Sequence, residues 1–459
     1  MATKKELVEA QAFSRRRLLT AFTSGAPGGR ELEPAKPMRG VVAGVVLSVL
    51  VIGGSLAFGL FNRGLPEDWE NGAIIVVSEN GARYVSQDGV LLPVENMASA
   101  RLVAPQDAPM YTVSESDLAD VPRGERVGIV GAPDALPEPA DLVGDRWRSC
   151  LDGNGAFLTS LDLPAEGETE ADQGAEGGDG VGTLVRAGGQ LVLVQGDRRY
   201  PVPESEFVGG VLRELGLDGA GAPEVDPRWL QLFDEGEPIE PFTVPGAGEP
   251  APGAAGDVQD ALVGSVLVES GTDDAFVIDD AGELAPLTPF ARAMYLIGPG
   301  GERAPIEVTT NEISSIATTP EADSPVPQTW PTLTPLPVED GAAPCALLTS
   351  GEDWSTALVA GPVPERTGVA MAPGAGALAR FVADPGTTSG PVRFIDENGT
   401  MYAITGEDQT GTLARLGYAT DDVAVVPYAW GDLFAAGPNL STAAAQNSVT
   451  EIPAAGEDE

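Results

Sequence analysis

Hydrophobic positions form one long run near the start of the chain and many short runs after it. The long run, GVVAGVVLSVLVIGGSLAFGLF at residues 40–61, holds 22 residues without a charge. A helix of this length can cross the hydrocarbon layer of a membrane. Later apolar runs have the length of strands, as in LVLV at 191–194 and VAVV at 423–426. The pattern predicts one transmembrane helix followed by a body of short strands.

Many of the short runs flank turn residues, which is the pattern of β-hairpins. YVSQDGVLL surrounds Asp88-Gly89, and FVIDDAGEL surrounds Ala281-Gly282; glycine at such positions favours tight turns. A segment with apolar residues at helical spacing follows the strands, as in ESEFVGGVLRELGL at 204–217. We therefore expect small units that each contain several strands and one helix.

Four stretches of the chain resemble one another in this order of strand, turn and strand. They begin near Ser78, Arg186, Glu269 and Ile395. Related units of this size bury their apolar faces against their neighbours. The chain has 58 Gly and 40 Pro among 459 residues, a composition that favours short strands and turns over long helices.

These patterns divide the chain into nine segments. Acidic stretches rich in Gly and Pro at 163–182 and 245–257 are typical of linkers. The expected segments are a cytoplasmic amphipathic helix and linker at 1–39, a transmembrane helix at 40–61, repeat units at 72–120, 183–250, 258–315 and 391–442, a central domain in two parts at 121–182 and 316–390, and a disordered tail at 443–459.

Charge is distributed unevenly along the chain. Residues 1–39 carry a net charge of +4, whereas the whole chain carries −43, and no lysine follows Lys36. The positive-inside rule therefore places residues 1–39 in the cytoplasm and the chain after about Asn62 outside. An outer body this acidic repels phosphate backbones, so we expect no nucleic-acid partner.

The basic residues around the apolar run are candidate functional residues. Within AFSRRRLLTAF, the arginines form a cytoplasmic basic cluster, on a helix whose apolar residues share roughly one face. The cluster is Arg15, Arg16 and Arg17; the membrane-flanking charges are Lys36, Arg39 and Arg63; the apolar residues are Val8, Ala12, Leu19 and Phe22. The same motif is close to an export signal, but 17 residues at 24–40 separate the arginines from the apolar run. No clear cleavage site follows that run, so we expect an uncleaved anchor.

Two cysteines, Cys150 and Cys345, lie in the part of the chain expected outside. An isolated pair in an oxidising compartment indicates one disulfide. Two buried free thiols and a metal site are the alternatives. The chain contains no histidine, so a zinc site would need carboxylates to complete its ligand set.

Motifs spread along nearly the whole chain carry a family resemblance. They are EAQAFSRRRLLTAF ahead of the apolar run, GIVGAPDALP with RWRSCLDG, WPTLTPLP with PCALL, and MAPGAGALAR at 371–380. Together they resemble EccB, a membrane component of the actinobacterial type VII (ESX) secretion system. The resemblance implies an α+β, mostly β fold, with a single N-terminal transmembrane helix. An elongated extracytoplasmic body of four strand-plus-helix repeat units would follow, around a central domain closed by a disulfide from Cys150 to Cys345.

The resemblance also implies a function and a set of partners. A member of this family would be a structural subunit in the inner (plasma) membrane that organises the outer part of a protein-export channel. Its implied partners are the EccC, EccD and EccE subunits, the mycosin protease, the lipid bilayer and further copies of the outer body. No cofactor is expected.

Two other classes of function remain as alternatives. Some members of the family are assigned nucleotide hydrolysis, but a P-loop requires a lysine, and SGAPGGRE at 24–31 has an arginine instead. Without histidine no Ser-His-Asp triad can form. The acidic pairs Asp273/Asp274, Asp279/Asp280 and Asp421/Asp422 are interpreted as solvated turn formers. An anchored cell-wall binder would need exposed aromatic residues, whereas we interpret Trp147, Trp229, Trp330, Trp354 and Trp430 as core residues.

Overall fold

The computed structural model describes most of the chain. It covers residues 3–24, 37–61, 65–161, 180–217, 221–331, 336–338, 341–350, 354–387, 389–406 and 408–449. In the second helix, side chains are described for residues 41–53. The chain forms two compact units, Met1–Leu65 and Pro66–Glu459.

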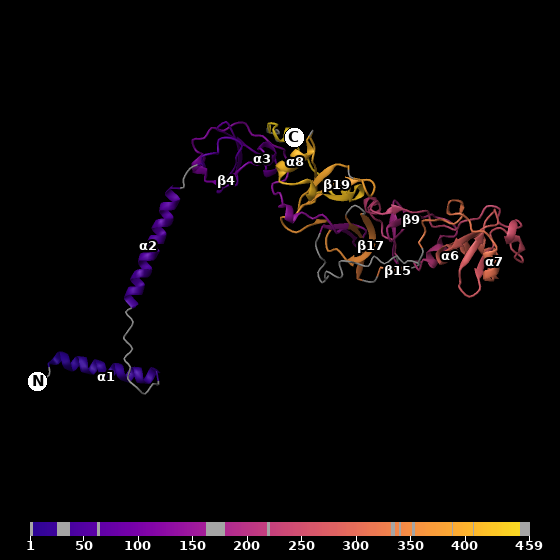
Figure 1. The fold of residues 1–459 in the computed structure, drawn as a ribbon, viewed down its shortest axis with the longest axis horizontal. Coiled ribbons are helices and arrows are strands. Elements are labelled where there is room, and N and C mark those ends of the chain that lie inside the picture. Colours follow the sequence, from indigo (N-terminus) through magenta and orange to yellow (C-terminus); the bar gives the residue numbers. More distant parts are fainter. Residues whose placement is uncertain are drawn as a thin grey trace, which may run out of the picture. The chain divides into compact units, whose positions relative to one another are not determined.

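The first unit contains two helices, α1 (Lys4–Ser24) and α2 (Pro37–Phe61) (Figure 1). The expected span at 40–61 lies within α2, and the described side chains of α2 are all exposed. Among the described residues, no helix combines the length and the apolar character that crossing a membrane requires.

Three sheets of the second unit share one chain connection. In each, three antiparallel strands are followed by a helix and then by a strand that pairs in parallel with the first. The first sheet uses β1 (Ile74–Val77), β2 (Arg83–Gln87), β3 (Val90–Pro93), α3 (Met97–Val103) and β4 (Met110–Val113). The third uses β11 (Val266–Glu269), β12 (Ala275–Ile278), β13 (Leu284–Leu287), α6 (Pro289–Ile297) and β14 (Ile306–Val308). The fourth uses β19 (Ala377–Val382), β20 (Val392–Ile395), β21 (Thr400–Ala403), α8 (Gln409–Leu416), β22 (Ala424–Pro427) and β23 (Ala435–Ala436).

The second sheet has the same plan but takes one strand from far along the chain. Its own segment supplies β7 (Val181–Ala187), β8 (Gln190–Gln195), β9 (Arg198–Val202), α4 (Val208–Glu214) and β10 (Asp234–Glu235). The strand parallel to β7 is β15 (Leu336–Pro337), which follows the whole third sheet. Both β15 and β19 lie within 316–390, the segment expected to be the second part of the central domain. The structure therefore differs from those boundaries, because backbone pairing assigns these strands to the second and fourth sheets.

A fifth sheet lies between these and is built from two distant segments. Its order is β17-β16-β5-β6-β18. The strands are β5 (Trp147–Leu151), β6 (Phe157–Leu161), β16 (Ala342–Thr349), β17 (Ser355–Pro362) and β18 (Gly368–Ala370). We call this the central sheet. The remaining helices are α5 (Pro227–Leu230), α7 (Thr310–Ser314), α9 (Tyr428–Gly431) and α10 (Thr442–Ala445), with 3-10 turns η1 (Glu115–Leu118), η2 (Pro139–Asp141), η3 (Gly253–Asp257), η4 (Pro299–Glu302), η5 (Glu321–Asp323) and η6 (Thr420–Asp422).

Two kinds of turn close the hairpins. Asp88 and Gly89 both have positive φ, 51° and 76°, as a two-residue type I′ turn requires. The turn around Gly282 is longer, since Ile278 pairs with Leu284 and residues 279–283 lie between them. Within it, the Gly282 N–H donates to the carbonyl of Asp279 at 3.2 Å. Asp279 is buried and accepts a hydrogen bond from the Thr319 hydroxyl at 2.7 Å. Its interpretation as a solvated turn former was therefore wrong: its side chain is buried, and its carboxylate connects this turn to the segment that contains Thr319.

The helices join the sheets in two pairs. α4 and α6 share a core that includes Leu215 and Phe290, and α3 and α8 share another that includes Leu102 and Leu416. In Figure 1, α3 and α8 lie next to each other, and their backbones approach closely. This second joint also contains a reciprocal polar exchange. Arg101 Nη1 donates to the carbonyl of Leu416 at 2.6 Å, and Arg415 Nη1 donates to the carbonyl of Ala104.

The joint between α3 and α8 predicts the effect of changing Gly417, the residue that ends α8. Gly417 has a φ of 101°, and a Cβ there would collide with Nη1 of Arg101. Gly417→Ala should therefore lower the free energy of unfolding by about 2–3 kcal/mol, through backbone strain and the lost Arg101 contact. Urea unfolding of the full chain in detergent micelles measures the change.

Gly81→Ala is the matched control for that substitution. Gly81 also has a positive φ, 69°, but no atom lies within 4 Å of its Cβ position. It should cost only about 1 kcal/mol, the strain term alone. Equal effects of the two substitutions would contradict a role for the Arg101 contact.

Candidate functional site

A disulfide closes the central sheet at its middle. Cys150 on β5 and Cys345 on β16 are direct partners in the antiparallel register, with their Cα atoms 4.0 Å apart. Their sulfur atoms are bonded and both residues are buried. The expected disulfide is confirmed, and neither cysteine is a free thiol or a metal ligand. The bond encloses a loop of 195 residues that contains the whole of the second and third sheets, β15 included.

The strand beside β16 leaves room for this disulfide. A Cβ at Gly361 on β17 would lie 2.5 Å from Cys345 Sγ and 3.5 Å from Cys150 Sγ. Ala343 and Val359 complete the apolar surroundings of the two sulfur atoms. The disulfide is therefore closely packed among small and apolar residues of β16 and β17.

Two tryptophans attach the central sheet to the sheets beside it. Trp229 on α5 donates its indole N–H to the carbonyl of Ser149 on β5 at 2.9 Å. Trp430 on α9 donates to the Thr356 hydroxyl on β17 at 3.0 Å. Both side chains are fully buried. The chain after each tryptophan is similar, WLQLF at 229–233 and WGDLF at 430–434, so the central sheet receives one such segment from each neighbouring side.

Rings from both segments fill one core with residues of the central sheet. Trp147 on β5 lies 6.3 Å from Trp430 and 5.6 Å from Phe434, ring centre to ring centre, in edge-to-face arrangements. Trp229 and Phe233 pack at 5.0 Å. Edge-to-face pairs add favourable energy beyond the burial of apolar area. This shared core links the second, central and fourth sheets.

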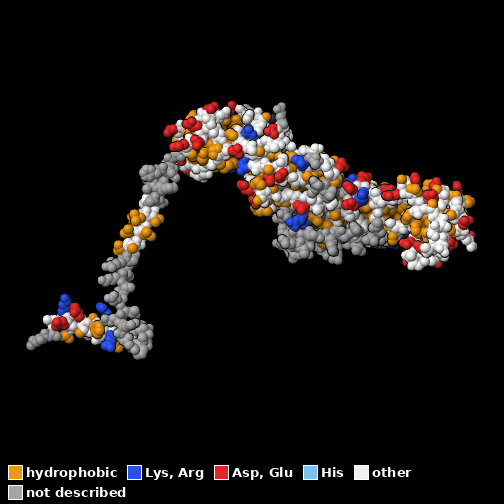
Figure 2. All heavy atoms as spheres, in the orientation of Figure 1, with side chains coloured by type: hydrophobic (Ala, Val, Ile, Leu, Met, Phe, Trp, Pro, Cys, Tyr) orange, Lys and Arg blue, Asp and Glu red, His pale blue; other side chains and the backbone are white. Residues whose placement is uncertain are grey.

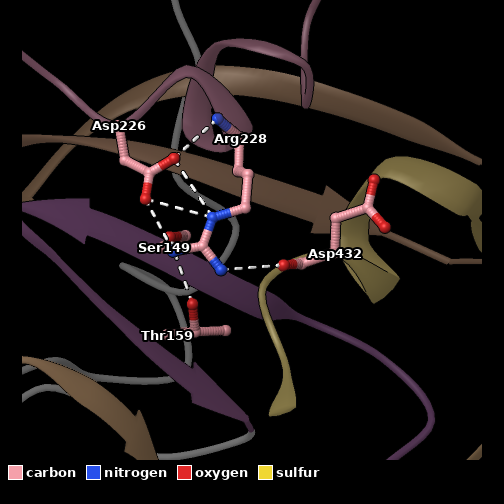
Figure 3. Close-up of polar contacts among 5 residues, drawn as sticks. All are labelled: Ser149, Thr159, Asp226, Arg228 and Asp432. Carbon is pink, nitrogen blue, oxygen red and sulfur yellow. Dashed lines mark hydrogen bonds and ion pairs between the residues drawn. The ribbon is translucent and has the colours of Figure 1, made fainter. Parts of the chain in front are cut away.

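A polar cluster lies at the edge of that core (Figure 3). Asp226 caps α5 by accepting the Arg228 backbone N–H at 2.9 Å, and its carboxylate binds the Arg228 guanidinium at 2.6 to 3.1 Å. Arg228 Nη1 also donates to the carbonyl of Asp432, which ends α9. The side-chain hydrogen bond lowers the pKa of Asp226 and raises the pKa of Arg228. This pair therefore stays charged at neutral pH and connects α5 to α9.

The motif GIVGAPDALP connects the first and fourth sheets. The Ile129 N–H donates to Ser99 on α3, and the Ile129 carbonyl accepts from the Asn96 side chain. At the other end, the Tyr418 hydroxyl donates to the carbonyl of Pro137 at 3.0 Å. Burial raises the pKa of Tyr418, so the hydroxyl keeps its proton and the bond. The motif thus connects the first and fourth sheets through hydrogen bonds at its two ends.

The cationic residues singled out from the sequence, where the structure describes them, lie in the first unit. Arg15, Arg16 and Arg17 lie exposed on α1 in the first unit. Arg39 lies in the first turn of α2, and Lys36 and Arg63 lie outside the described residues. Figure 2 shows acidic side chains across the visible face of the second unit, with fewer basic ones.

The structure describes the tryptophans that a glycan-binding surface would need. Trp147, Trp229, Trp330 and Trp430 are buried, so they form core and cannot stack on a glycan; Trp354 is half-buried against the same core. Within the described ranges, no cluster of three or more acidic or cysteine side chains could hold a metal ion.

Comparison with known families decides where this chain belongs. The family model described as "Type VII secretion system ESX-1, transport TM domain B" matches residues 1–454. The chain belongs to the EccB family of type VII secretion systems. The resemblance inferred from the motifs is thereby confirmed over almost the whole length.

Individual EccB relatives are similar over part of the chain. The "ESX-5 secretion system ATPase EccB5" of Mycobacterium tuberculosis (strain H37Rv) is 28% identical over 303 residues, which are 62% of this chain. The match spans 58% of that relative's own length.

Solved EccB structures establish the fold. The chain matches a subunit of an intact ESX-5 inner membrane complex with a TM-score of 0.65 at 22% identity, over 99% of this chain and 96% of that one. It matches an EccB3 dimer from an ESX-3 core complex with a TM-score of 0.64 at 23% identity, over 82% and 100%. A mixed, mostly β fold with one disulfide is thereby confirmed for this EccB chain.

Sequence reasoning missed the two attachment segments of the central sheet, although a signal exists. The pattern Trp-x-x-Leu-Phe occurs at 229–233 and 430–434 and lies after the helix of the second and of the fourth sheet. The repetition predicted from the sequence rested on the hairpins and on the helical segment that follows them. The Trp-x-x-Leu-Phe segments are thus a further repeated element, which follows the hairpins and the helix in these two units.

Removal of the disulfide should loosen the central sheet. The double substitution Cys150→Ala and Cys345→Ala should lower the free energy of unfolding by about 3–5 kcal/mol, because the unfolded chain regains the freedom of the 195-residue loop. Urea unfolding of the full chain in micelles, followed by tryptophan fluorescence, measures the loss. Dithiothreitol should shift the wild type to the variant's midpoint and leave the variant unchanged; equal midpoints for wild type and variant would refute a stabilising bridge.

The pair of Asp226 and Arg228 predicts a pH dependence. Because the folded pKa of Asp226 lies below its ordinary 3.8, the pair's stabilisation is complete above that value and is lost as the pH falls through the folded pKa. Asp226→Asn should cost up to about 1 kcal/mol at pH 7, since the pair is partly exposed. The difference from wild type should shrink below pH about 3.8.

Urea titrations at pH 7 and pH 3 measure that difference. Glu365→Gln, at an exposed position, is the control and should leave stability unchanged at both pH values. A cost for Asp226→Asn that is the same at both would show that charge plays no part.

Proposed function

We propose that this chain is a structural subunit of a type VII secretion membrane complex and that it organises the outer part of the export channel. The family match over residues 1–454 carries the proposal. The second unit supports it, since its sheets are joined by a covalently closed central sheet and by buried helix pairs. Such a body holds its surfaces in a fixed arrangement, which is what a scaffold requires.

We further propose that residues 40–61 cross the membrane once, with residues 1–39 in the cytoplasm and the second unit outside. The run is uncharged over 22 residues and falls within one helix. Its described large apolar side chains, Val41 to Ile52, are 52 to 65% exposed. A bilayer would remove this apolar area from water at a gain of roughly 25 cal/mol per Å². The net charge of +4 on residues 1–39 favours this orientation.

Four repeat units form the outer body in this proposal. The shared connection of three antiparallel strands, a helix and a parallel fourth strand supports a common origin for the four sheets. The unit boundaries then follow the strands: the fourth unit begins with β19 at Ala377, and the second is completed by β15. The central sheet holds the two pairs of units together.

The proposed partners are EccC, EccD, EccE, the mycosin protease, the lipid bilayer and a second copy of the chain. Solved relatives occur in an inner membrane complex and as a dimer, which makes the same assembly the natural proposal here. The exposed arginines Arg15, Arg16 and Arg17 on α1 offer a cytoplasmic docking surface for acidic protein surfaces or lipid head groups.

Affinity purification of the full chain from its native membrane in mild detergent tests this proposal. We expect the EccC, EccD and EccE subunits to co-purify and to be identified by mass spectrometry. Substituting Arg15, Arg16 and Arg17 together by Gln should reduce their recovery at least five-fold, because the densest cytoplasmic charge is removed. Recovery without any of these subunits would refute the proposed assembly.

A matched variant and an activity assay complete the experiment. Lys4 and Lys5 also lie on α1, so Lys4→Gln with Lys5→Gln removes charge from the same helix and should leave recovery unchanged. Some relatives are named ATPases, whereas a scaffold should not hydrolyse ATP. Hydrolysis that persists through purification and is lost on one substitution in the outer body would contradict a purely structural role.

A further inference from the structure

A cavity of about 150 Å³ lies beside the C-terminal ends of α3 and α8. Its lining combines apolar residues with two arginines, one from each helix. Its lining includes Arg101, Arg415, Gln106, Met110 and Gly417. Met110 is 48% exposed, so the cavity opens to solvent on that side.

The two arginines are arranged reciprocally. Ala100-Arg101-Leu102 in α3 and Ala414-Arg415-Leu416 in α8 are the same tripeptide. Each arginine donates one N–H to a carbonyl at the end of the other helix. The partial negative charge of a helix C-terminus favours a cation there. These bonds fix both guanidiniums at the wall of the cavity.

Within the described part of the chain, most donors of the two guanidiniums are not used in a hydrogen bond. A guanidinium has five N–H donors, and the described hydrogen bonds use one on each arginine. Among the described residues, neither Arg101 nor Arg415 has a carboxylate within ion-pair distance. The chain has 69 acidic and 26 basic residues, so carboxylates are abundant, yet none in the described part pairs with these two.

The other helix joint shows that helix packing does not require arginines. α4 and α6 end in Leu215-Gly216 and Ile297-Gly298, as α8 ends in Leu416-Gly417. Counted from these ends, the positions that match Arg415 hold Glu214 and Leu296. Of these two joints, only the one between α3 and α8 has paired arginines at its helix ends, and the other joint packs without them.

We propose that this cavity binds an oxyanion group, a phosphate or a carboxylate, between Arg101 and Arg415. Two guanidinium forks match the oxygen atoms of such a group, and the cavity has room for it. A bound oxyanion also offsets the repulsion between two cations that face one space. The Gln106 side chain in the lining supplies an amide, and the apolar residues of the lining suit the carbon atoms that carry the oxyanion.

Titration calorimetry with sodium phosphate tests the site. The full chain in detergent micelles is titrated at constant ionic strength, because surface charge is screened by salt. We expect saturable binding of one phosphate per chain, with Kd at least ten-fold weaker in Arg101→Gln and in Arg415→Gln. Arg366→Gln removes the same charge from an exposed position and should bind as the wild type does.

A second pair of variants leaves the reciprocal arginine bonds intact. Met110→Glu places a carboxylate at the cavity without changing either arginine, and it should abolish phosphate binding by occupying the site. Met110→Gln, of the same size but neutral, should retain binding within about three-fold. Unchanged phosphate binding in Met110→Glu would overturn the proposal even if an arginine variant failed to fold.

A parallel titration with sodium glutarate separates the two sources of the oxyanion. Tighter binding of phosphate would indicate a phosphate-bearing ligand, and tighter binding of glutarate would indicate an acidic side chain of a partner protein. Binding of either anion supports the site if that binding is lost in both arginine variants. Saturable binding of neither anion would overturn it.

Discussion

The pairing of β5 with β16 is the constraint on which the outer body depends. These strands come from segments nearly 200 positions apart, and the bond between Cys150 and Cys345 fixes their register. The loop that they close contains the second and third sheets, which pack on each other through α4 and α6. The chain outside the loop contains the first and fourth sheets, which pack through α3 and α8. The pairing of β5 with β16 therefore divides the four sheets into two pairs, one within the disulfide loop and one outside it.

Local features of this fold could be predicted from the sequence, and non-local ones could not. Asp88-Gly89 predicts a tight turn because only two neighbouring residues must adopt positive φ. The disulfide was predictable because the chain has only two cysteines. In contrast, β15 is a two-residue strand whose partner β7 lies far earlier in the chain, and no local pattern marks it. The burial of Asp279 was also not predictable, because the Thr319 hydroxyl that binds its carboxylate lies 40 positions away in the chain.

Four of the motifs that carry the family resemblance, all in the second unit, map to places where sheets or strands from distant segments meet. GIVGAPDALP joins α3 to Tyr418, and RWRSCLDG and PCALL supply the disulfide-linked strands. In MAPGAGALAR, the Gly376 carbonyl accepts from Val143, and a Cβ there would lie 2.9 Å from Pro137. A residue between two sheets must fit the side chains of both, whereas a residue at a hairpin turn packs against its own sheet alone. Fewer residue types therefore suit the positions between sheets. Short motifs therefore reveal the family better than the repeated hairpins do.

The two helix joints have the same backbone plan but different chemistry, and this difference bears on what each can do. The joint of α4 and α6 is apolar, so its stability comes from area removed from water. The joint of α3 and α8 adds two cations held by helix-end carbonyls beside an open cavity. Because charged side chains attract ions of opposite charge, the stability of this joint can depend on a bound anion. The stability of an apolar joint has no such dependence. Within the described body, the first and fourth sheets are thus the pair whose contact a ligand can strengthen.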